Sequence, residues 1–336
     1  MSANREPGFE RRGDAFLAAL NQALRDGEDK TTATMDTRSR FPVVFVVGPP
    51  RSGTTLLIQW LARTGQFAVP SNLMARMPEA PYLAGMLQRL LTDPTVNYRG
   101  ELDAVNDQMD SVAGKTRGVL GAHEFFYFWR RFFPLDIARP LTADERGAVD
   151  QAGFARGIGL LQQALNLPLA MKAIIAQYDL DLVMQALPTS ILAVTSRDEV
   201  SNVESLLWAR RTVLGSEQTW FSARPPGSES FDEDSPVTQV AAQVALTNDH
   251  LEDQLRKFDP SRVVRVAHHE FCASPSTTYA ALARACAQLG HQLGPYVGPA
   301  SFVEHRRPSE RADAIAKELD RVRGHRTIDD APAPPG

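Results

Sequence analysis

This sequence has few cysteines, no long apolar runs and no excess of positive charge, and each of these absences excludes a class of protein. The 336 residues include two cysteines, Cys272 and Cys286, too few for a disulfide framework or a cysteine-based zinc site. No apolar run approaches the roughly 18 residues of a membrane-spanning helix, and the first residues, MSANREPGFERRGD, contain no apolar signal region. We therefore expect a cytoplasmic protein in a reducing environment, with no transmembrane span.

The balance of charge also restricts the partners of the protein. The formal net charge is −4 and the pI is about 6.0, whereas a general nucleic-acid-binding protein carries an excess of Lys and Arg. We therefore expect no nucleic-acid partner. Hydrophobic residues make up 43% of the chain, enough for the core of one large domain. Nothing in the sequence indicates an oligomeric state.

The stretch FPVVFVVGPPRSGTTLLIQWLARTG, residues 41–65, predicts a buried strand, a tight loop and a helix. Gly48 and Gly53 permit backbone conformations in which consecutive N–H groups converge on one anion. The helix that follows has a positive N-terminal end, which also favours a phosphate. The loop resembles a phosphate-binding P-loop in which Thr54 stands where lysine is usual, while Arg51 supplies the positive charge from within the loop.

A second candidate site follows another predicted strand. The segment ILAVTSRDEVSNVESLLWARR has an apolar run over residues 191–194, then Arg197 at the strand end. A helix pattern follows, and it places Ser205 eight residues after Arg197. This spacing allows both side chains to point at one phosphate, from the end of the strand and from the helix.

The remaining chain alternates between strand and helix signals, which predicts an α/β fold with a single doubly wound, mostly parallel sheet and helices on both faces. We expect residues 1–40 to form a polar, mobile segment with a short helix around residues 15–24. Residues 41–310 would form the main domain, and residues 311–336 a C-terminal helix and a flexible tail. Strands are expected at residues 41–47, 169–175, 191–194 and 263–267, and helices at residues 56–64, 72–91, 180–187, 200–211, 238–258 and 277–289.

With both motifs in view, the chain resembles the sulfotransferases that use 3′-phosphoadenosine-5′-phosphosulfate (PAPS). In that family, Lys or Arg precedes Ser-Gly-Thr-Thr in the loop that binds the 5′-phosphosulfate, and an Arg and a Ser bind the 3′-phosphate. The resemblance implies a P-loop-like sulfotransferase fold and transfer of a sulfuryl group to a hydroxyl without a metal. The cofactor-binding residues that it implies are Pro50, Arg51, Ser52, Gly53, Thr54, Thr55, Leu56, Arg197 and Ser205.

In-line attack by an acceptor hydroxyl on sulfur needs a base for the hydroxyl proton, and Arg51 to stabilise charge on the leaving oxygens. His123 and Glu124, in the string GAHEFFYFWRRFF, are the first candidates, because related bacterial proteins often carry a His-Glu-Phe type string before an aromatic helix. Glu79, in ARMPEAP, is the competing candidate. The family often has a lysine at the place of Lys172, near the sulfonate or the acceptor.

The acceptor is expected to be a small apolar or aromatic hydroxyl compound, because aromatic residues crowd residues 125–133 and the sequence offers no basic cleft for a polyanionic glycan. Residues 216–237 are either a solvated loop or a lid that closes over the acceptor. Residues 305–307, His-Arg-Arg, lie where the family's last basic loop reaches the 3′-phosphate, although its Arg-Lys-Gly string is absent.

Two other functions remain open at this stage. A small-molecule kinase that uses ATP and Mg²⁺ would need lysine at Thr54. A non-catalytic protein that binds PAPS or another nucleotide would place both candidate bases away from the sulfur. Binding of adenosine 3′,5′-bisphosphate, compared with that of ATP and Mg²⁺, separates the sulfotransferase from the kinase.

Overall fold

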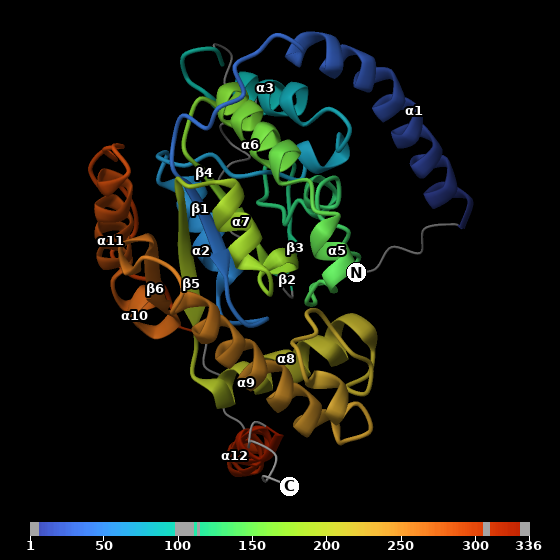
Figure 1. Ribbon diagram of the computed structural model, residues 1–336, viewed down its shortest axis with the longest axis vertical. Helices are drawn as coiled ribbons and strands as arrows, with labels where there is room; N and C mark the ends of the chain where they lie inside the picture. Colours follow the sequence, from blue (N-terminus) through green and yellow to red (C-terminus); the bar gives the residue numbers. More distant parts are fainter. Residues whose placement is uncertain (1–6, 98–110, 113–114, 305–309, 330–336) are drawn as a thin grey trace, which may run out of the picture.

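A computed structural model describes residues 7–97, 111–112, 115–304 and 310–329 (Figure 1). Four strands form one parallel sheet in the order β4-β1-β5-β6, namely β1 (Val43–Val47), β4 (Leu169–Lys172), β5 (Ser190–Ser196) and β6 (Val263–Ala267). A separate two-stranded antiparallel pair consists of β2 (Ser111–Val112) and β3 (Lys115–Thr116). The α-helices are α1 (Pro7–Thr32), α2 (Thr54–Arg63), α3 (Pro81–Thr92), α4 (Phe126–Trp129), α5 (Ala143–Gly147), α6 (Gln151–Leu165), α7 (Leu180–Ala186), α8 (Glu199–Leu214), α9 (Pro236–Leu255), α10 (His268–Ala273), α11 (Pro275–Gln288) and α12 (Ala312–Asp329). Short 3-10 helices cover Met74–Arg76, Ile174–Ala176, Ser228–Phe231 and Pro260–Arg262.

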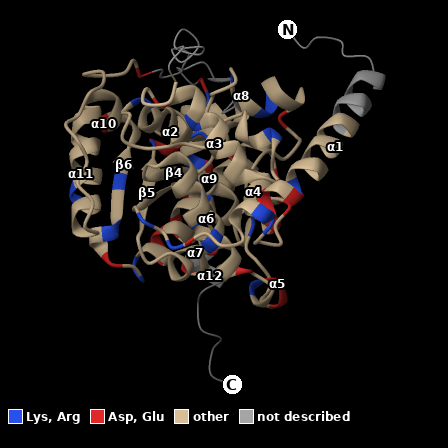
Figure 2. Ribbon diagram, turned by 90° about the horizontal axis from the view of Figure 1, so that it is seen from above, with Lys and Arg blue, Asp and Glu red and all other residues tan. Residues whose placement is uncertain are grey.

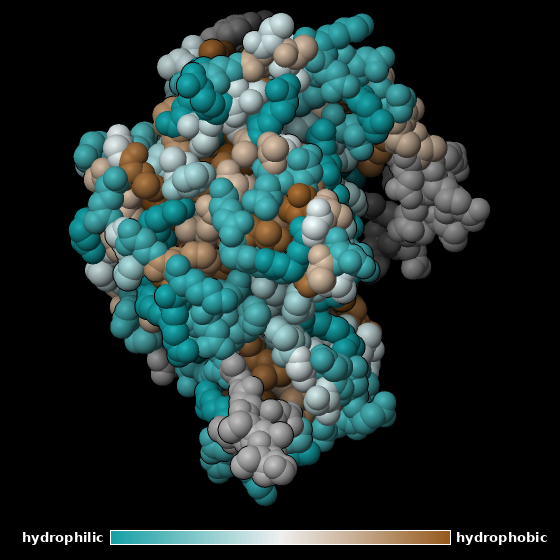
Figure 3. All heavy atoms as spheres, viewed as in Figure 1, coloured by the Kyte–Doolittle hydropathy of each residue, from teal (hydrophilic) through white to brown (hydrophobic). Residues whose placement is uncertain are grey.

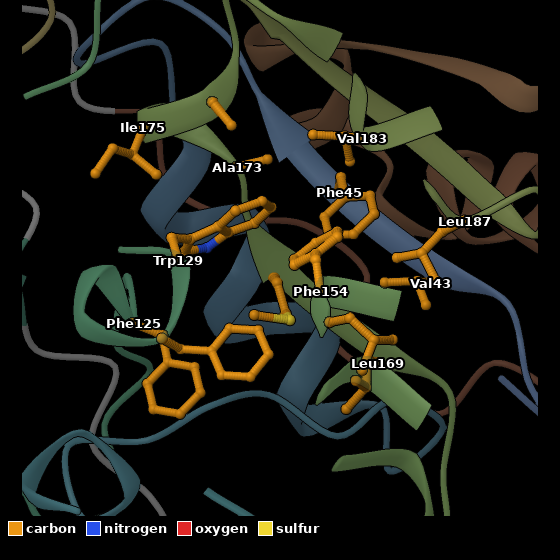
Figure 4. Packing of buried hydrophobic residues seen from close by; sticks show 14 of the residues in the cluster. Val43, Phe45, Phe125, Trp129, Phe154, Leu169, Ala173, Ile175, Val183 and Leu187 are labelled. Carbon is orange, nitrogen blue, oxygen red and sulfur yellow. The ribbon is translucent and has the colours of Figure 1, made fainter. Parts of the chain in front are cut away.

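The sheet is covered on both faces because β1 is apolar on both sides. Val43, Phe45 and Val47 pack against α6, α7 and α9 in one core cluster, while Val44 and Val46 pack against α2 and α11 in a second. Figure 4 shows part of the first cluster, with aromatic rings from three separate segments between the strands and helices. This arrangement confirms the expected doubly wound parallel sheet with helices on both faces.

A third core cluster lies below the sheet in Figure 1, where α8, α9 and α12 pack together. Ile315, Leu319 and Val322 of α12 are buried in this cluster. Basic and acidic residues are interspersed over the ribbon in Figure 2, and on the face shown in Figure 3 small hydrophobic groups are separated by hydrophilic residues. Among the described residues, no helix is long and apolar enough to cross a membrane.

The N-terminal helix is longer than the sequence predicts. α1 covers Pro7–Thr32, not only the region around residues 15–24. Its C-terminal half is attached to the domain, because the buried Glu28 carboxylate accepts the backbone N–H groups of Tyr82 and Leu83 at the start of α3, at 2.8 and 3.0 Å. These N–H groups have no partner within α3, so Glu28 caps that helix.

The aromatic segment forms a shorter helix than expected. α4 contains only Phe126–Trp129, and Phe125 before it has a φ of 58°. Phe125, Phe128, Trp129 and Phe133 are buried in the first core cluster. Most of the aromatic residues therefore serve core packing, as their spacing predicts.

The two edge strands of the sheet, β4 and β6, each carry a feature that limits pairing with a further strand. At the β4 edge, Ala68 forms a parallel bridge with Leu169, and its backbone exchanges hydrogen bonds with Pro168 and Ala170. At the β6 edge, the strand is five residues long and carries exposed Arg265 in its middle, paired with Glu252.

Candidate functional site

The carboxyl ends of the four parallel strands meet at one edge of the sheet, where ligands bind in open α/β folds. β1 ends in the loop that contains Arg51, β4 ends at Lys172, β5 leads into Arg197, and β6 leads into His268. Four basic or titratable side chains from distant parts of the sequence are therefore brought to one place.

The loop after β1 requires glycine at two positions. A Cβ atom at Gly48, whose φ is 148°, would lie 2.2 Å from Thr195 Oγ1 and 2.5 Å from the Thr195 carbonyl oxygen. A Cβ atom at Gly53, whose φ is 106°, would lie 2.6 Å from Cδ2 of His268. Glycine removes both clashes and adopts the left-handed backbone at Gly53 without strain.

Two buried amide side chains hold the same loop. Gln177 Oε1 accepts the Gly48 N–H at 3.2 Å, and Asn202 Nδ2 donates to the Pro50 carbonyl oxygen at 2.6 Å. Both side chains are fully buried. The buried atoms Gln177 Nε2 and Asn202 Oδ1 have no hydrogen-bond partner among the described residues, so each amide is satisfied on one side only.

The residues just before and at the start of α2 have different roles. Ser52 is fully buried, and its Oγ lies 2.6 Å from Thr195 Oγ1, so its hydroxyl is bound within the fold. The Leu56 side chain packs against the second core cluster, which leaves its backbone as the part available to a ligand. Thr54 and Thr55 begin α2, whose N-terminal N–H groups and dipole favour an anion.

The two sequence motifs meet in the structure. Arg51 Nε donates to Ser205 Oγ at 3.3 Å, and Arg197 Nη1 lies 3.5 Å from the Arg51 carbonyl oxygen. The Arg51 guanidinium also lies over the ring of Trp208, 6.0 Å from its centroid. Arg51 has a φ of 69°, an uncommon conformation for a residue with a side chain. The structure thus brings the two motifs together through Arg51, and a common phosphate for Arg197 and Ser205 stays a prediction.

Lys172 connects the loop to the candidate bases. Its Nζ donates to Thr55 Oγ1 at 2.8 Å and to Glu124 Oε1 at 3.2 Å. The Lys172 side chain is only 3% exposed, whereas that of Glu124 is 35% exposed. Burial lowers the pKa of Lys172 below its usual value, the Glu124 carboxylate opposes this shift, and nearby Arg51 adds to it.

His123 lies beside Glu124 in a defined orientation. Its Nδ1 accepts the backbone N–H of Phe125 at 2.8 Å, so the proton of the neutral ring is on Nε2. Burial lowers the pKa of His123; the positive charges of Lys172 and Arg76 act in the same direction, and Glu124 acts against them. His123 is therefore neutral at neutral pH.

A pocket of about 860 Å³ opens beside this pair. His123 and Glu124 line it, together with apolar side chains that include Leu73, Val119 and Phe126. Its volume is within the range of about 300–1,000 Å³ that is typical of small-molecule sites. Glu124 lines the pocket and binds Lys172, which in turn binds Thr55 at the start of α2. The pocket therefore adjoins the candidate phosphate-binding loop.

Glu79, the competing base, does not line this pocket. Its carboxylate pairs with Arg25 of α1 at 2.9 Å, and its backbone N–H donates to Asn21 Oδ1 at 3.2 Å. Residues 305–307, expected near the 3′-phosphate, lie outside the described residues.

Residues 216–237, expected to be either a solvated loop or a lid, pack against α8 and α9. The Trp220 ring has the guanidinium groups of Arg210 and Arg224 at 5.0 and 4.3 Å from its centroid. Gln243 Nε2 donates to the carbonyl oxygens of Phe221 and Ala223. These contacts hold the segment in place, and closure over an acceptor stays a prediction.

Sequence reasoning missed several residues of the site. Gln177, Asn202, Thr195 and Trp208 hold the loop or Arg51, and no local motif indicates them. His268 stands in the string VVRVAHHEFCASP, where its position at the end of a predicted strand was the available signal. Its pKa is lowered by burial and by nearby Arg197. Within the described ranges, no group of three or more His, Cys, Asp and Glu side chains could hold a metal ion.

A sequence model described as the sulfotransferase family matches residues 42–290. No curated protein matches the sequence. Among solved structures, the chain is similar to a sulfotransferase from Mycobacterium tuberculosis, with 13% identity, a TM-score of 0.48, and coverage of 91% of this chain and 79% of that one. It is also similar to a sulfotransferase from Mycobacterium avium, with 17% identity, a TM-score of 0.48 and coverage of 90% and 81%.

Proposed function

The chain belongs to the sulfotransferase family, and on that premise we propose that it transfers the sulfuryl group of PAPS to a hydroxyl of a small acceptor. The observation that carries this proposal is the chain of contacts Thr55–Lys172–Glu124. It joins the start of α2, where an anion is favoured, to a carboxylate in the wall of a pocket. A nucleotide-binding protein without catalysis would not need a candidate base in this place.

The residues at the strand ends suit a doubly phosphorylated cofactor. The N–H groups at the start of α2, with Arg51 and Lys172, would hold the 5′-phosphosulfate end. Arg197 and Ser205 would hold the 3′-phosphate. The tight approach of backbone at Gly48 and Gly53, which excludes any side chain there, fits a loop that wraps an anion closely. When bound, PAPS supplies an activated sulfur atom for attack by the acceptor oxygen.

Glu124 is the group best placed to take the acceptor proton. In neutral His123 the proton is on Nε2, and the lone pair of Nδ1 is already engaged by the Phe125 N–H. His123 can therefore donate a hydrogen bond to the acceptor oxygen, but it has no available basic nitrogen in this orientation. Glu79 is engaged with Arg25 and lies outside the pocket lining. Lys172 would hold the Glu124 carboxylate in position and add positive charge near the sulfonate.

The kinase alternative has less support. It requires lysine at Thr54, and it requires a carboxylate arrangement for Mg²⁺. Binding separates the two functions directly. We expect adenosine 3′,5′-bisphosphate to bind far more tightly than ATP with Mg²⁺ in titration calorimetry. The reverse order would overturn the sulfotransferase proposal.

The assignment of the base is tested by mutation. Glu124→Gln should lower kcat by about 10²–10⁴-fold, with little change in the Kd of adenosine 3′,5′-bisphosphate. Glu79→Gln is the matched control, and we expect it to retain the wild-type kcat. If Glu79→Gln is inactive while Glu124→Gln is active, the base lies in the ARMPEAP segment.

A further inference from the structure

The wall of the acceptor pocket carries positive charge that the proposed reaction does not use. Besides His123 and Glu124, its lining includes Arg76, which follows the pocket residue Ala75, and Arg130, just after α4. The two arginines come from separate parts of the chain. A purely apolar acceptor, as the aromatic content of the sequence predicts, would leave the charge of both side chains without a counterion in the pocket.

Arg76 lines the same pocket as His123 and Glu124. Its side chain is exposed, and no carboxylate pairs with it among the residues that the structure describes. Its positive charge contributes to the lowered pKa of His123, which lines the same pocket. Arg76 therefore presents a planar fork of N–H donors to the pocket.

Three other polar side chains of the lining, those of Arg130, Asn72 and Thr116, are already engaged. Arg130 donates to the carbonyl oxygens of Leu135 and Asp136. Asn72 Nδ2 donates to the carbonyl oxygens of Thr116 and Gly118, at 3.2 and 2.7 Å. Thr116 Oγ1 donates to the Ala122 carbonyl oxygen at 2.6 Å.

Charge within the pocket is also unbalanced. The negative charge of Glu124 is matched by Lys172 at 3.2 Å, and burial together with nearby positive charges keeps His123 neutral. The charges of Arg76 and Arg130 remain in excess. An anion in this pocket would meet net positive charge and one guanidinium with its hydrogen-bonding edge available.

We propose that the acceptor is a hydroxylated carboxylic acid, whose carboxylate binds Arg76 while its hydroxyl lies at Glu124. Its apolar body would pack against Leu73, Val119 and Phe126. One planar fork of N–H donors matches both oxygens of a carboxylate, so a single arginine is enough to bind this group in two places. This inference rests on the proposed function, since it takes the pocket to be the acceptor site.

The test compares matched probes that differ only in charge. Omega-hydroxydodecanoate and para-hydroxyphenylpropanoate are each paired with their methyl esters. Binding to the protein saturated with adenosine 3′,5′-bisphosphate is measured by calorimetry, so turnover is not required. We expect at least one acid to bind about ten-fold more tightly than its ester. Arg76→Gln should remove that preference without changing the affinity for the ester.

Arg131→Gln is the matched control. Arg131 neighbours Arg130 but donates to the Pro78 carbonyl oxygen and lies over the Phe132 ring, outside the pocket lining. It should keep the preference for the acid. Unchanged affinity of Arg76→Gln for adenosine 3′,5′-bisphosphate would show that the variant is folded.

Three results would overturn the inference: equal binding of acid and ester in the wild type, a preference that survives Arg76→Gln, or no binding of either member of both pairs. The proposed function fails separately, through weak binding of adenosine 3′,5′-bisphosphate or absence of PAPS-dependent transfer. Transfer to the esters with no preference for the acids would leave the sulfotransferase activity in place and refute the carboxylate site alone.

Discussion

Replacing Lys172 with methionine should separate the activity of this protein from its stability. Methionine has a similar length and is apolar, so it fills the buried space of the lysine stem without its charge. The change removes the ammonium from its two contacts, Thr55 Oγ1 at 2.8 Å and Glu124 Oε1 at 3.2 Å. Each consequence can be estimated from the surroundings of these atoms.

The effect on stability should be small. A buried ammonium costs several kcal/mol in lost hydration, and the Lys172 side chain is 3% exposed. Glu124 is 35% exposed, so its carboxylate can be hydrated after the pair is broken. Replacing buried ionic groups with apolar ones of similar volume is often neutral or stabilising. We therefore expect the free energy of unfolding of Lys172→Met to be within about 1–2 kcal/mol of the wild-type value, or higher.

The effect on activity should be large. Removing one preorganised charge or donor from a reaction centre typically lowers kcat by about 10²–10³-fold, which corresponds to about 2.7–4 kcal/mol of transition-state stabilisation. Lys172 also orients Glu124, so its loss should raise KM for the acceptor much less than it lowers kcat.

The pH dependence provides a second readout, because the free energy of unfolding and kcat should change in opposite directions as the pH rises. Burial lowers the pKa of Lys172 in the folded protein below its unfolded value. The unfolded chain therefore binds more protons between the two pKa values, so the free energy of unfolding rises with pH in that interval. Over the same alkaline interval Lys172 loses its charge, and kcat should fall. Both changes should disappear in Lys172→Met.

The assay is kcat for PAPS-dependent transfer, measured beside urea unfolding of the same preparations from neutral to alkaline pH. A Lys172→Met variant with kcat within about three-fold of wild type would refute the role assigned to Lys172. A variant that unfolds at much lower urea would show that the lysine is structural instead.

Two further outcomes concern the cofactor loop. Gly53→Ala should weaken binding of adenosine 3′,5′-bisphosphate by about ten-fold or more, because a φ of 106° is strained for alanine by about 1–3 kcal/mol and the new Cβ meets the His268 ring. In a His268→Ala background, calorimetry should show that only the loss of affinity due to the clash is restored. Full restoration of the affinity would contradict the backbone argument. Arg197→Ala should bind adenosine 3′,5′-bisphosphate and adenosine 5′-monophosphate almost equally, because it loses charge-assisted hydrogen bonds of about 1.5–3 kcal/mol each to the 3′-phosphate. If the wild-type protein already binds the two nucleotides equally, the motif around Arg197 has only a structural role.

The features that the sequence predicts well are those with a local signal. An apolar run predicts β1, the glycines and prolines after it predict the loop at Gly48 and Gly53, and the helical pattern that follows predicts α2. The proximity of the two motifs was also accessible, because parallel strands end at the same edge of the sheet, although the hydrogen bond between Arg51 and Ser205 was not predicted.

Other features were not accessible because their causes lie far away in the sequence. α6 was not expected, since its segment contains several glycines, which disfavour helices. The structure shows that these glycines serve close packing: a Cβ at Gly157 would lie 3.0 Å from Phe128, and one at Gly159 would lie 1.8 Å from the Thr37 carbonyl oxygen. Arg76 carries no motif, and only the folded pocket shows that it lies near His123.

The treatment of the two sheet edges bears on how the protein behaves at high concentration. An exposed edge strand offers unpaired N–H and C=O groups to other chains and promotes aggregation. Here the bridge between Ala68 and Leu169 engages the outer backbone groups at the start of β4. β6, at the other edge, is short and places the charge of Arg265 in its middle. Both edges therefore resist the addition of a foreign strand, which favours solubility of the folded protein during expression and storage.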